Sequence, residues 1–92
     1  MANKRVHVFY SGRVQGVGFR ITAEEVAQSF DVVGWVKNLK DGRVELVAES
    51  DEETLGRFLE AMRVGPMKNF IGNIEISWCA ATRSFDEFSI RY

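Results

Sequence analysis

The stretch SGRVQGVGFR (residues 11–20) lies where the pattern of a strand gives way to the pattern of a helix. Before it, apolar residues alternate with others from Val6 to Tyr10, which predicts a half-buried strand. After it, apolar residues from Phe19 to Phe30 recur at the offsets of one helix face. The three glycines between the two patterns permit backbone conformations that other residues resist, or the close approach of a chain segment or an anion.

A hairpin is predicted next. Residues 32–39 are rich in β-branched and apolar side chains, and apolar residues alternate again over residues 44–49. Lys-Asp-Gly at 40–42 has the composition of a tight turn, with its glycine where φ is expected to be positive. Asn38 is therefore expected at the end of the first strand of this hairpin.

A second helix and two more strands complete the pattern. Ser50 and Glu53 match a capping box, in which each side chain satisfies a backbone amide at a helix start. The dipeptide GP at 65–66 is a helix stop signal. Alternating residues at 74–78 and 88–92 then predict two strands. The apolar stripe of the helix consists of Leu55, Phe58, Leu59 and Met62.

The order β-α-β-β-α-β, with a short extra C-terminal strand, predicts an α+β fold of the ferredoxin-like type. Right-handed crossovers place both helices on one face of an antiparallel sheet. We expect residues 1–92 to form a single domain. In this architecture the first two strands run parallel with the third between them, so the glycine-rich stretch and Asn38 meet at one edge. Ligands commonly bind beyond the carboxyl ends of strands.

Composition narrows the class of protein. A net charge of −1 argues against a large nucleic-acid interface, which requires a basic surface. No apolar run is long enough to span a membrane, and the first ten residues do not form a signal peptide, so we expect a cytoplasmic protein. The single cysteine, Cys79, excludes an internal disulfide, and burial as a small apolar residue is favoured over a reactive thiol.

The glycine-rich stretch fits neither common nucleotide-binding motif. No Gly-Lys-Ser/Thr follows Gly12 at Walker A spacing, and Ile21 stands where a dinucleotide fingerprint starting at Gly16 needs a glycine. Backbone amides at the start of a helix can nevertheless form a concave anion site. The guanidinium of Arg20, in the first helical turn, can hold two oxygens of a phosphate. The phosphate-binding candidates are Gln15, Gly16, Val17, Gly18, Phe19 and Arg20.

Each candidate has a plainer interpretation. The stretch 11–20 can be a flexible connection whose arginines are solvated. Asn38 can serve only the turn that follows it. The sequence contains no cluster of residues at metal-ligand spacing, and its one histidine, His7, is expected on the sheet surface. An arginine, backbone amides and an asparagine without a base suit phosphoryl transfer from a good leaving group, such as a carboxylate.

Three segments resemble the acylphosphatase family: SGRVQGVGFR (11–20), GWVKNLKDGRVELVAE (34–49) and the ending FSIRY (88–92). The resemblance implies hydrolysis of small acyl phosphates to a carboxylate and orthophosphate, with no metal and no cofactor. It also implies that Arg20 binds the phosphate and that Asn38 orients the attacking water, whose proton passes to a phosphate oxygen. We expect a monomer that binds these small molecules and neither nucleic acid nor membrane.

Two other functions remain to be weighed. The main alternative is a non-catalytic ferredoxin-like binding or regulatory module. An RNA-binding version would expose aromatic residues such as Phe9 and Trp35, but it would also need a basic surface, which the net charge of −1 argues against. The other is an acylphosphatase-like domain of a larger carbamoyl-transferring protein. The initial methionine and the ending RY favour a free-standing chain.

Overall fold

The predicted order of strands and helices is observed in the computed structural model, which describes residues 4–92. Residues 1–3 lie outside the described range. They belong to the first ten residues, in which the sequence predicts no signal peptide. The elements are β1 (Lys4–Gly12), α1 (Phe19–Ser29), β2 (Val33–Asn38), β3 (Val44–Ser50), α2 (Glu52–Val64), a 3₁₀ turn η1 (Lys68–Phe70), β4 (Ile71–Ala80) and β5 (Phe88–Arg91).

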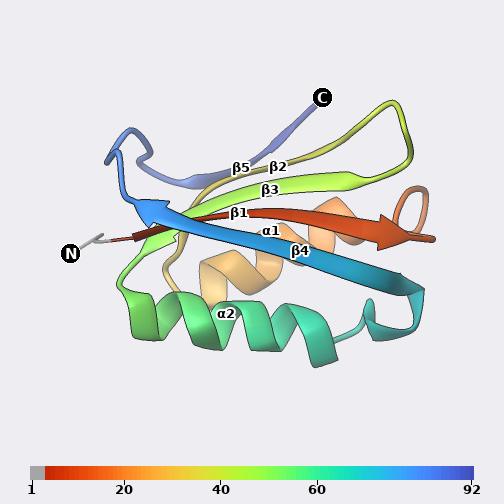
Figure 1. Cartoon of the computed structure of the whole chain (residues 1–92), viewed down its shortest axis with the longest axis horizontal. Helices are drawn as coiled ribbons and strands as arrows, with labels where there is room; N and C mark the ends of the chain where they lie inside the picture. The colour runs from red at the N-terminus through yellow and green to blue at the C-terminus, as the bar shows by residue number, and fades with distance from the viewer. Residues whose placement is uncertain (1–3) are drawn as a thin grey trace.

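The strands form one sheet in the order β4-β1-β3-β2-β5, with both helices on one face (Figure 1). As predicted, β1 and β2 are parallel and separated by β3, which pairs antiparallel with each of them. The extra strand β5 pairs parallel with β2, so the five-stranded sheet is mixed. The carboxyl ends of β1 and β2 therefore lie at the same end of the sheet.

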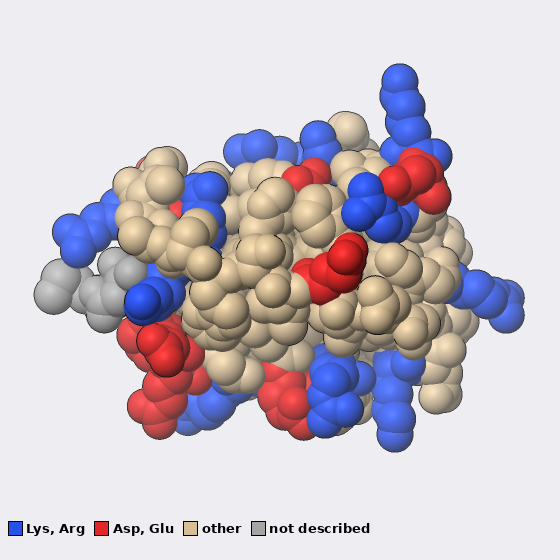
Figure 2. All heavy atoms as spheres, in the orientation of Figure 1, with Lys and Arg blue, Asp and Glu red and all other residues tan. Residues whose placement is uncertain are grey.

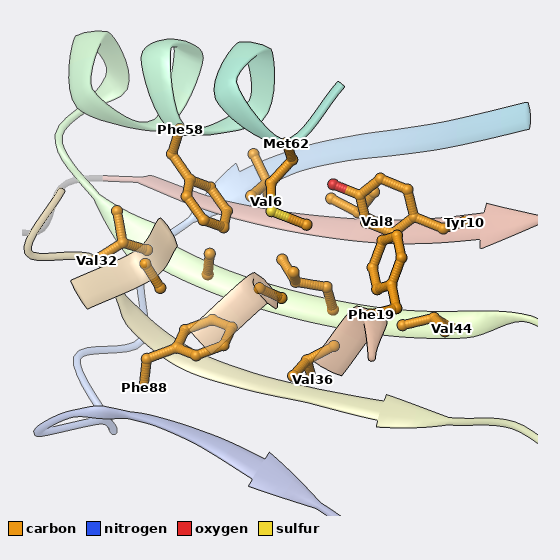
Figure 3. Close-up of a cluster of buried hydrophobic side chains, with 14 of the residues drawn as sticks. Val6, Val8, Tyr10, Phe19, Val32, Val36, Val44, Phe58, Met62 and Phe88 are labelled. Carbon is orange, nitrogen blue, oxygen red and sulfur yellow. The ribbon is translucent and has the colours of Figure 1, made fainter. Parts of the chain in front are cut away.

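The core lies between the sheet and the two helices, and it fixes where α1 begins (Figure 3). Alternate residues of β1, including Val6, Val8 and Tyr10, are almost fully buried. The Tyr10 ring packs against Phe19, the first residue of α1, with ring centroids 4.9 Å apart. Because both rings are buried, this contact holds the helix start beside the end of β1. Burial also raises the pKa of the Tyr10 phenol.

The start of α2 differs from the predicted capping box of Ser50 and Glu53. Ser50 is the last residue of β3 and pairs with Lys4 of β1. Asp51 is the N-cap instead, and its carboxylate accepts hydrogen bonds from the Thr54 amide and hydroxyl, both at 2.8 Å. The capping-box prediction was wrong because sheet pairing extends the strand through Ser50, which moves the cap by one residue.

The edge strand β4 exposes apolar side chains that its alternation predicts to be buried. Ile76 and Trp78 face the helix side, opposite Val8 and Val6, yet remain 42% and 46% exposed because α2 does not cover the edge. Figure 2 shows that the face carrying β4 has few charged side chains across its middle. Cys79 is also exposed, so its predicted burial was wrong.

Neither helix of residues 4–92 combines the length and the apolar character that crossing a membrane requires.

Candidate active site

The loop between β1 and α1 (residues 13–18, hereafter the β1–α1 loop) is fixed at both of its ends. The Arg13 amide donates a 2.9 Å hydrogen bond to the Phe70 carbonyl, which ties the start of the loop to η1. At the other end, the Gly18 carbonyl accepts from the Thr22 amide at 3.1 Å, closing the first turn of α1. The loop therefore has a defined path although it contains no regular structure.

Two glycines give this loop its shape. Gly16 has φ 76° and Gly18 has φ 84°, both in the left-handed region that favours glycine. A Cβ at either position would meet no atom within 4 Å, so backbone conformation and not crowding requires glycine there. Left-handed residues among successive amides turn the N–H groups toward one side, as in anion-binding nests.

The amides of residues 15–20 have no acceptor in the part of the chain that the structure describes, residues 4–92. They precede or open α1, whose N-cap Gly18 provides no side-chain cap. Val17 packs partly buried against the core and Phe19 is buried, so the backbone that carries these amides is held by apolar contacts. Free amides at a helix N-terminus, with its partial positive charge, suit a bound anion.

The Gln15 side chain is used for a purpose that the sequence did not indicate. Its Nε2 donates hydrogen bonds to the Leu39 carbonyl at 2.7 Å and the Arg43 carbonyl at 2.9 Å. Both acceptors belong to the turn between β2 and β3. The side chain therefore joins the β1–α1 loop to this turn, which leaves the backbone amide of Gln15 for the predicted phosphate-binding role.

Arg20 lies in the first turn of α1, as predicted, but its guanidinium lies against the C-terminal residues. Nη1 donates a long hydrogen bond of 3.4 Å to the Arg91 carbonyl. Cζ is 4.8 Å from the centroid of the Tyr92 ring, a cation–π distance. Tyr92 is 95% exposed and Arg20 is half-buried, and within residues 4–92 Nη1 is the guanidinium nitrogen that has a hydrogen-bond partner.

Asn38 is the last residue of β2, as predicted. Its neighbours in the chain connect it to Arg20 and to the β1–α1 loop. It has the parity of the fully buried Val36, which places it on the helix side of the sheet. Lys37, before it, pairs with Arg91, whose carbonyl accepts the Arg20 bond. The residue after it, Leu39, accepts the hydrogen bond from the β1–α1 loop. The structure thus brings the predicted residues to one end of the sheet (Figure 1).

Two pairs of titratable groups lie near this end, Arg43 with Asp41 in the β2–β3 turn and His7 with Glu45 on the opposite face of the sheet. Hydrogen bonds from the backbone and side chain of Arg43 hold the pKa of Asp41 below its ordinary value. His7 lies on the face away from the helices, as predicted, and its Nε2 is 2.6 Å from the Glu45 carboxylate. Within residues 4–92, no group of three or more His, Cys, Asp or Glu side chains is arranged to hold a metal.

Two pockets lie elsewhere, at the end of the sheet where β2 begins and β3 ends. The first is lined by Ser29, Phe30, Asp31, Ser50, Asp51, Thr54 and Arg57, and the second by Gln28, Asp31, Val32, Val33, Asp86, Glu87 and Phe88. Neither is lined by any of the predicted site residues, and at the first pocket the Asp51 carboxylate already caps the start of α2. A phosphoryl group needs hydrogen-bond donors more than an enclosed volume, so we place the candidate site at the β1–α1 loop.

Comparison with known proteins gives one consistent result. A family model described as Acylphosphatase matches residues 6–90. The acylphosphatase of Methylococcus capsulatus is 45% identical over 87 residues, covering 95% of each chain. The acylphosphatase of Bacillus velezensis is 46% identical over 87 residues, covering 94% of this chain and 96% of its own.

The fold agrees with the same assignment. The crystal structure of acylphosphatase from Bacillus subtilis superposes with a TM-score of 0.90 at 37% identity, covering 97% of this chain and 99% of that one. These matches favour an enzyme over the non-catalytic binding module. They extend over nearly the whole chain, including both segments that form the candidate site. The chain belongs to the acylphosphatase family.

Proposed function

We propose that the amides of residues 15–20 and the Arg20 guanidinium bind the phosphoryl group of a small acyl phosphate, and that Asn38 orients the water that attacks it. As a member of its family, the chain is a hydrolase acting on acid anhydrides. The observation that carries these residue roles is the row of unused amides next to Arg20 and to the end of β2.

The phosphoryl group carries negative charge that is spread over its equatorial oxygens in the transition state. The row of amides supplies donors that need no reorganisation, because the loop backbone is already fixed by Val17 and Phe19. The Arg20 guanidinium adds a positive charge and a planar pair of donors. Its Nη1 makes one long hydrogen bond to the Arg91 carbonyl, and Nε and Nη2 have no acceptor within residues 4–92, so they are available to an anion.

Attack requires a water on the side of phosphorus opposite the leaving oxygen. The Asn38 amide can accept from and donate to such a water, which fixes its position without making it more basic. The water oxygen forms the new P–O bond while the bond to the acyl oxygen breaks and its electron pair leaves with the carboxylate. The water's proton passes to a phosphate oxygen, so the products are a carboxylate and orthophosphate.

In our proposal the reaction needs no acid to protonate the leaving group and no metal ion. A carboxylate is stable as an anion at neutral pH, because carboxyl groups have ordinary pKa values near 4. The site grips the phosphoryl part, so we infer a range of small acyl phosphates as substrates. We further propose a cytoplasmic monomer that does not bind nucleic acid, a proposal supported by the net charge of −1.

The test compares phosphate binding with turnover in three proteins. Inorganic phosphate is the product, and a ligand that binds only the folded state raises its melting temperature. Phosphate should stabilise wild type and Asn38→Ala but not Arg20→Ala. Release of phosphate from benzoyl or acetyl phosphate should be rapid in wild type, and it should fall steeply in both variants. Activity should persist after exhaustive treatment with EDTA.

Three results would contradict these assignments. Full activity of Asn38→Ala would leave Asn38 with only a turn role. Loss of phosphate stabilisation in Asn38→Ala, as complete as in Arg20→Ala, would place Asn38 among the phosphate-binding groups. Loss of activity with EDTA that a divalent metal restores would show that the metal-free mechanism is wrong.

A further inference from the structure

The side chain of Gln15 connects the two halves of the candidate site. Its Nε2 lies 2.7 Å from the Leu39 carbonyl and 2.9 Å from the Arg43 carbonyl. Both partners are obligate acceptors, so the group that faces them must be the amide nitrogen and both of its hydrogens are used. The orientation of this amide therefore follows from its partners.

The two carbonyls are the same groups that close the β2–β3 turn. The Leu39 amide donates to the Arg43 carbonyl at 2.8 Å, and the Gly42 amide donates to the Leu39 carbonyl at 3.2 Å. Gln15 thus binds the hydrogen-bonded part of the turn, which begins one residue beyond Asn38. A change in this attachment would shift the end of β2 relative to the β1–α1 loop.

Other attachments of the loop lead away from this turn. Arg13 is bonded to Phe70 near β4, and Gly18 to Thr22 within α1. Among the hydrogen bonds described for residues 4–92, those of Gln15 are the ones that join the β1–α1 loop to the β2–β3 turn. Apolar packing holds the loop on the core, but its hydrogen-bonded attachment to the turn beyond Asn38 depends on one side chain.

We propose that Gln15 is a positioning residue that sets the distance between the bound phosphoryl group and the water held by Asn38. The proposal rests on the proposed function of Asn38. In-line attack tolerates little error, and a misplacement of about 1 Å can lower a rate about 100-fold. The backbone amide of Gln15 stays in the phosphate-binding row, while its side chain acts only through the position of β2.

Substitution should lower kcat more than phosphate affinity. Gln15→Ala should reduce kcat about 10- to 100-fold, by loosening the geometry of attack, and should change the dissociation constant of inorganic phosphate less than about 3-fold. Gln15→Asn should behave similarly, because its shorter side chain cannot reach both carbonyls. An unchanged kcat in both variants would overturn the proposal.

Gln15→Glu provides a readout in the pH profile. An ionised carboxylate cannot donate to the two carbonyls and repels them, whereas its protonated form regains one donor. The ratio of variant to wild-type kcat should therefore rise as pH falls through the titration of this carboxyl. A pH-independent ratio would indicate that the side chain contributes only to stability.

The decisive experiment combines Gln15→Ala with Asn38→Ala. If Gln15 acts by placing the water held by Asn38, its removal should lower kcat less than about 2-fold once Asn38 is absent. Equal losses in both backgrounds would overturn the positioning role while leaving the role of Asn38 intact. Full activity of the Asn38→Ala single variant would instead contradict the proposed function of Asn38, and the Gln15 proposal with it.

Two control variants separate positioning from general destabilisation. Asp51→Ala removes the N-cap of α2 at the opposite end of the sheet and should lower the melting temperature without changing kcat below it. Gln28→Ala removes an exposed glutamine of α1 and should change neither. If Asp51→Ala lowers kcat as much as Gln15→Ala at matched stability, the loss at Gln15 is one of stability and the proposal is wrong.

Discussion

The two ends of the sheet differ in whether their polar groups have hydrogen-bond partners inside the protein. At the end where β3 leads into α2, the carboxylate of Glu49 accepts four hydrogen bonds and is 1% exposed. At the other end, the amides of residues 15–20 have no acceptor within residues 4–92. Figure 1 shows these ends on the left and right, joined by β1 and β3.

Glu49 fastens the segment between β4 and β5 to the outer face of the sheet. Its oxygens accept from Arg5 Nε at 2.8 Å, from the Thr82 amide at 2.9 Å and hydroxyl at 3.0 Å, and from the Arg83 amide at 3.0 Å. Burial acts to raise the pKa of this carboxyl, but the hydrogen bonds from Thr82, Arg5 and Arg83 outweigh it and lower the pKa. This end is therefore built for stability.

The comparison of the two ends shows two roles that polar groups can have in this fold. Buried polar groups with all partners inside the protein stabilise the fold. Donors that are held in place but lack an internal partner can bind a ligand, which then completes the network. Substitutions at the β1–α1 end should thus change turnover, whereas those at Glu49 should change stability.

The largest effect is expected for Arg20→Lys. Lysine keeps the positive charge but lacks the planar fork, so one charge-assisted contact in the transition state is lost. This should cost about 2–4 kcal/mol, or about 30- to 1000-fold in kcat/KM. The measurement is hydrolysis of an acyl phosphate, with the melting temperature as control. Near-wild-type turnover of Arg20→Lys would contradict the assignment of Arg20 to phosphate binding.

Glu49→Gln should give the opposite result, with reduced stability and normal turnover. The amide keeps the shape but replaces acceptor oxygen by donor nitrogen, which leaves at least one of the Thr82, Arg83 or Arg5 donors unsatisfied. The free energy of unfolding should fall by about 2–3 kcal/mol, measured by denaturant titration. Glu45→Gln, at the partly exposed partner of His7, is the matched control and should cost less. Equal costs would show that burial of Glu49 contributes nothing.

Acid should weaken the Glu49 end selectively. Because the pKa of Glu49 is lowered in the folded state, its stabilisation is complete above the ordinary carboxyl pKa of about 4.3 and is lost as pH falls through the lower folded-state value. The stability difference between wild type and Glu49→Gln should therefore shrink below about pH 4. A constant difference from pH 7 to pH 2 would exclude this linkage.

The smallest effect is expected for Tyr92→Leu. The ring holds the Arg20 guanidinium through a contact worth about 0.5–1 kcal/mol at an exposed position. Phosphate affinity should weaken about 2- to 5-fold, measured by titration calorimetry. Tyr92→Phe keeps the ring and should bind phosphate as wild type does. A similar loss in both variants would point to the hydroxyl and not to the ring.

The elements and the approximate site could be predicted because they depend on local patterns. The change of period at Phe19 located α1, and the turn glycine Gly42, observed with φ 96°, located the hairpin and hence Asn38. The position of β3 between β1 and β2 was predicted from the ferredoxin-like architecture, whereas the parallel pairing of β5 with β2 was not. The family resemblance was confirmed, whereas the catalytic roles of Arg20 and Asn38 stay predictions.

The features that could not be predicted depend on partners distant in sequence. Cys79 pairs with Arg5 on the face of the edge strand β4 that points away from the helices, and it is exposed there. Ser50 is drawn into β3 by pairing with Lys4, so Asp51 caps α2. The Gln15 side chain binds backbone carbonyls, and a backbone carbonyl has no sequence signature.

The central position of β1 has a consequence for how the chain folds during synthesis. β1 pairs on one edge with β3 and on the other with β4, so Lys4 lies beside both Ser50 and Ala80. Its second edge stays open until β4 has left the ribosome, and closing so long a loop carries an entropic cost. Folding should therefore finish late and cooperatively, over roughly milliseconds to seconds and not microseconds, since distant pairings limit its rate.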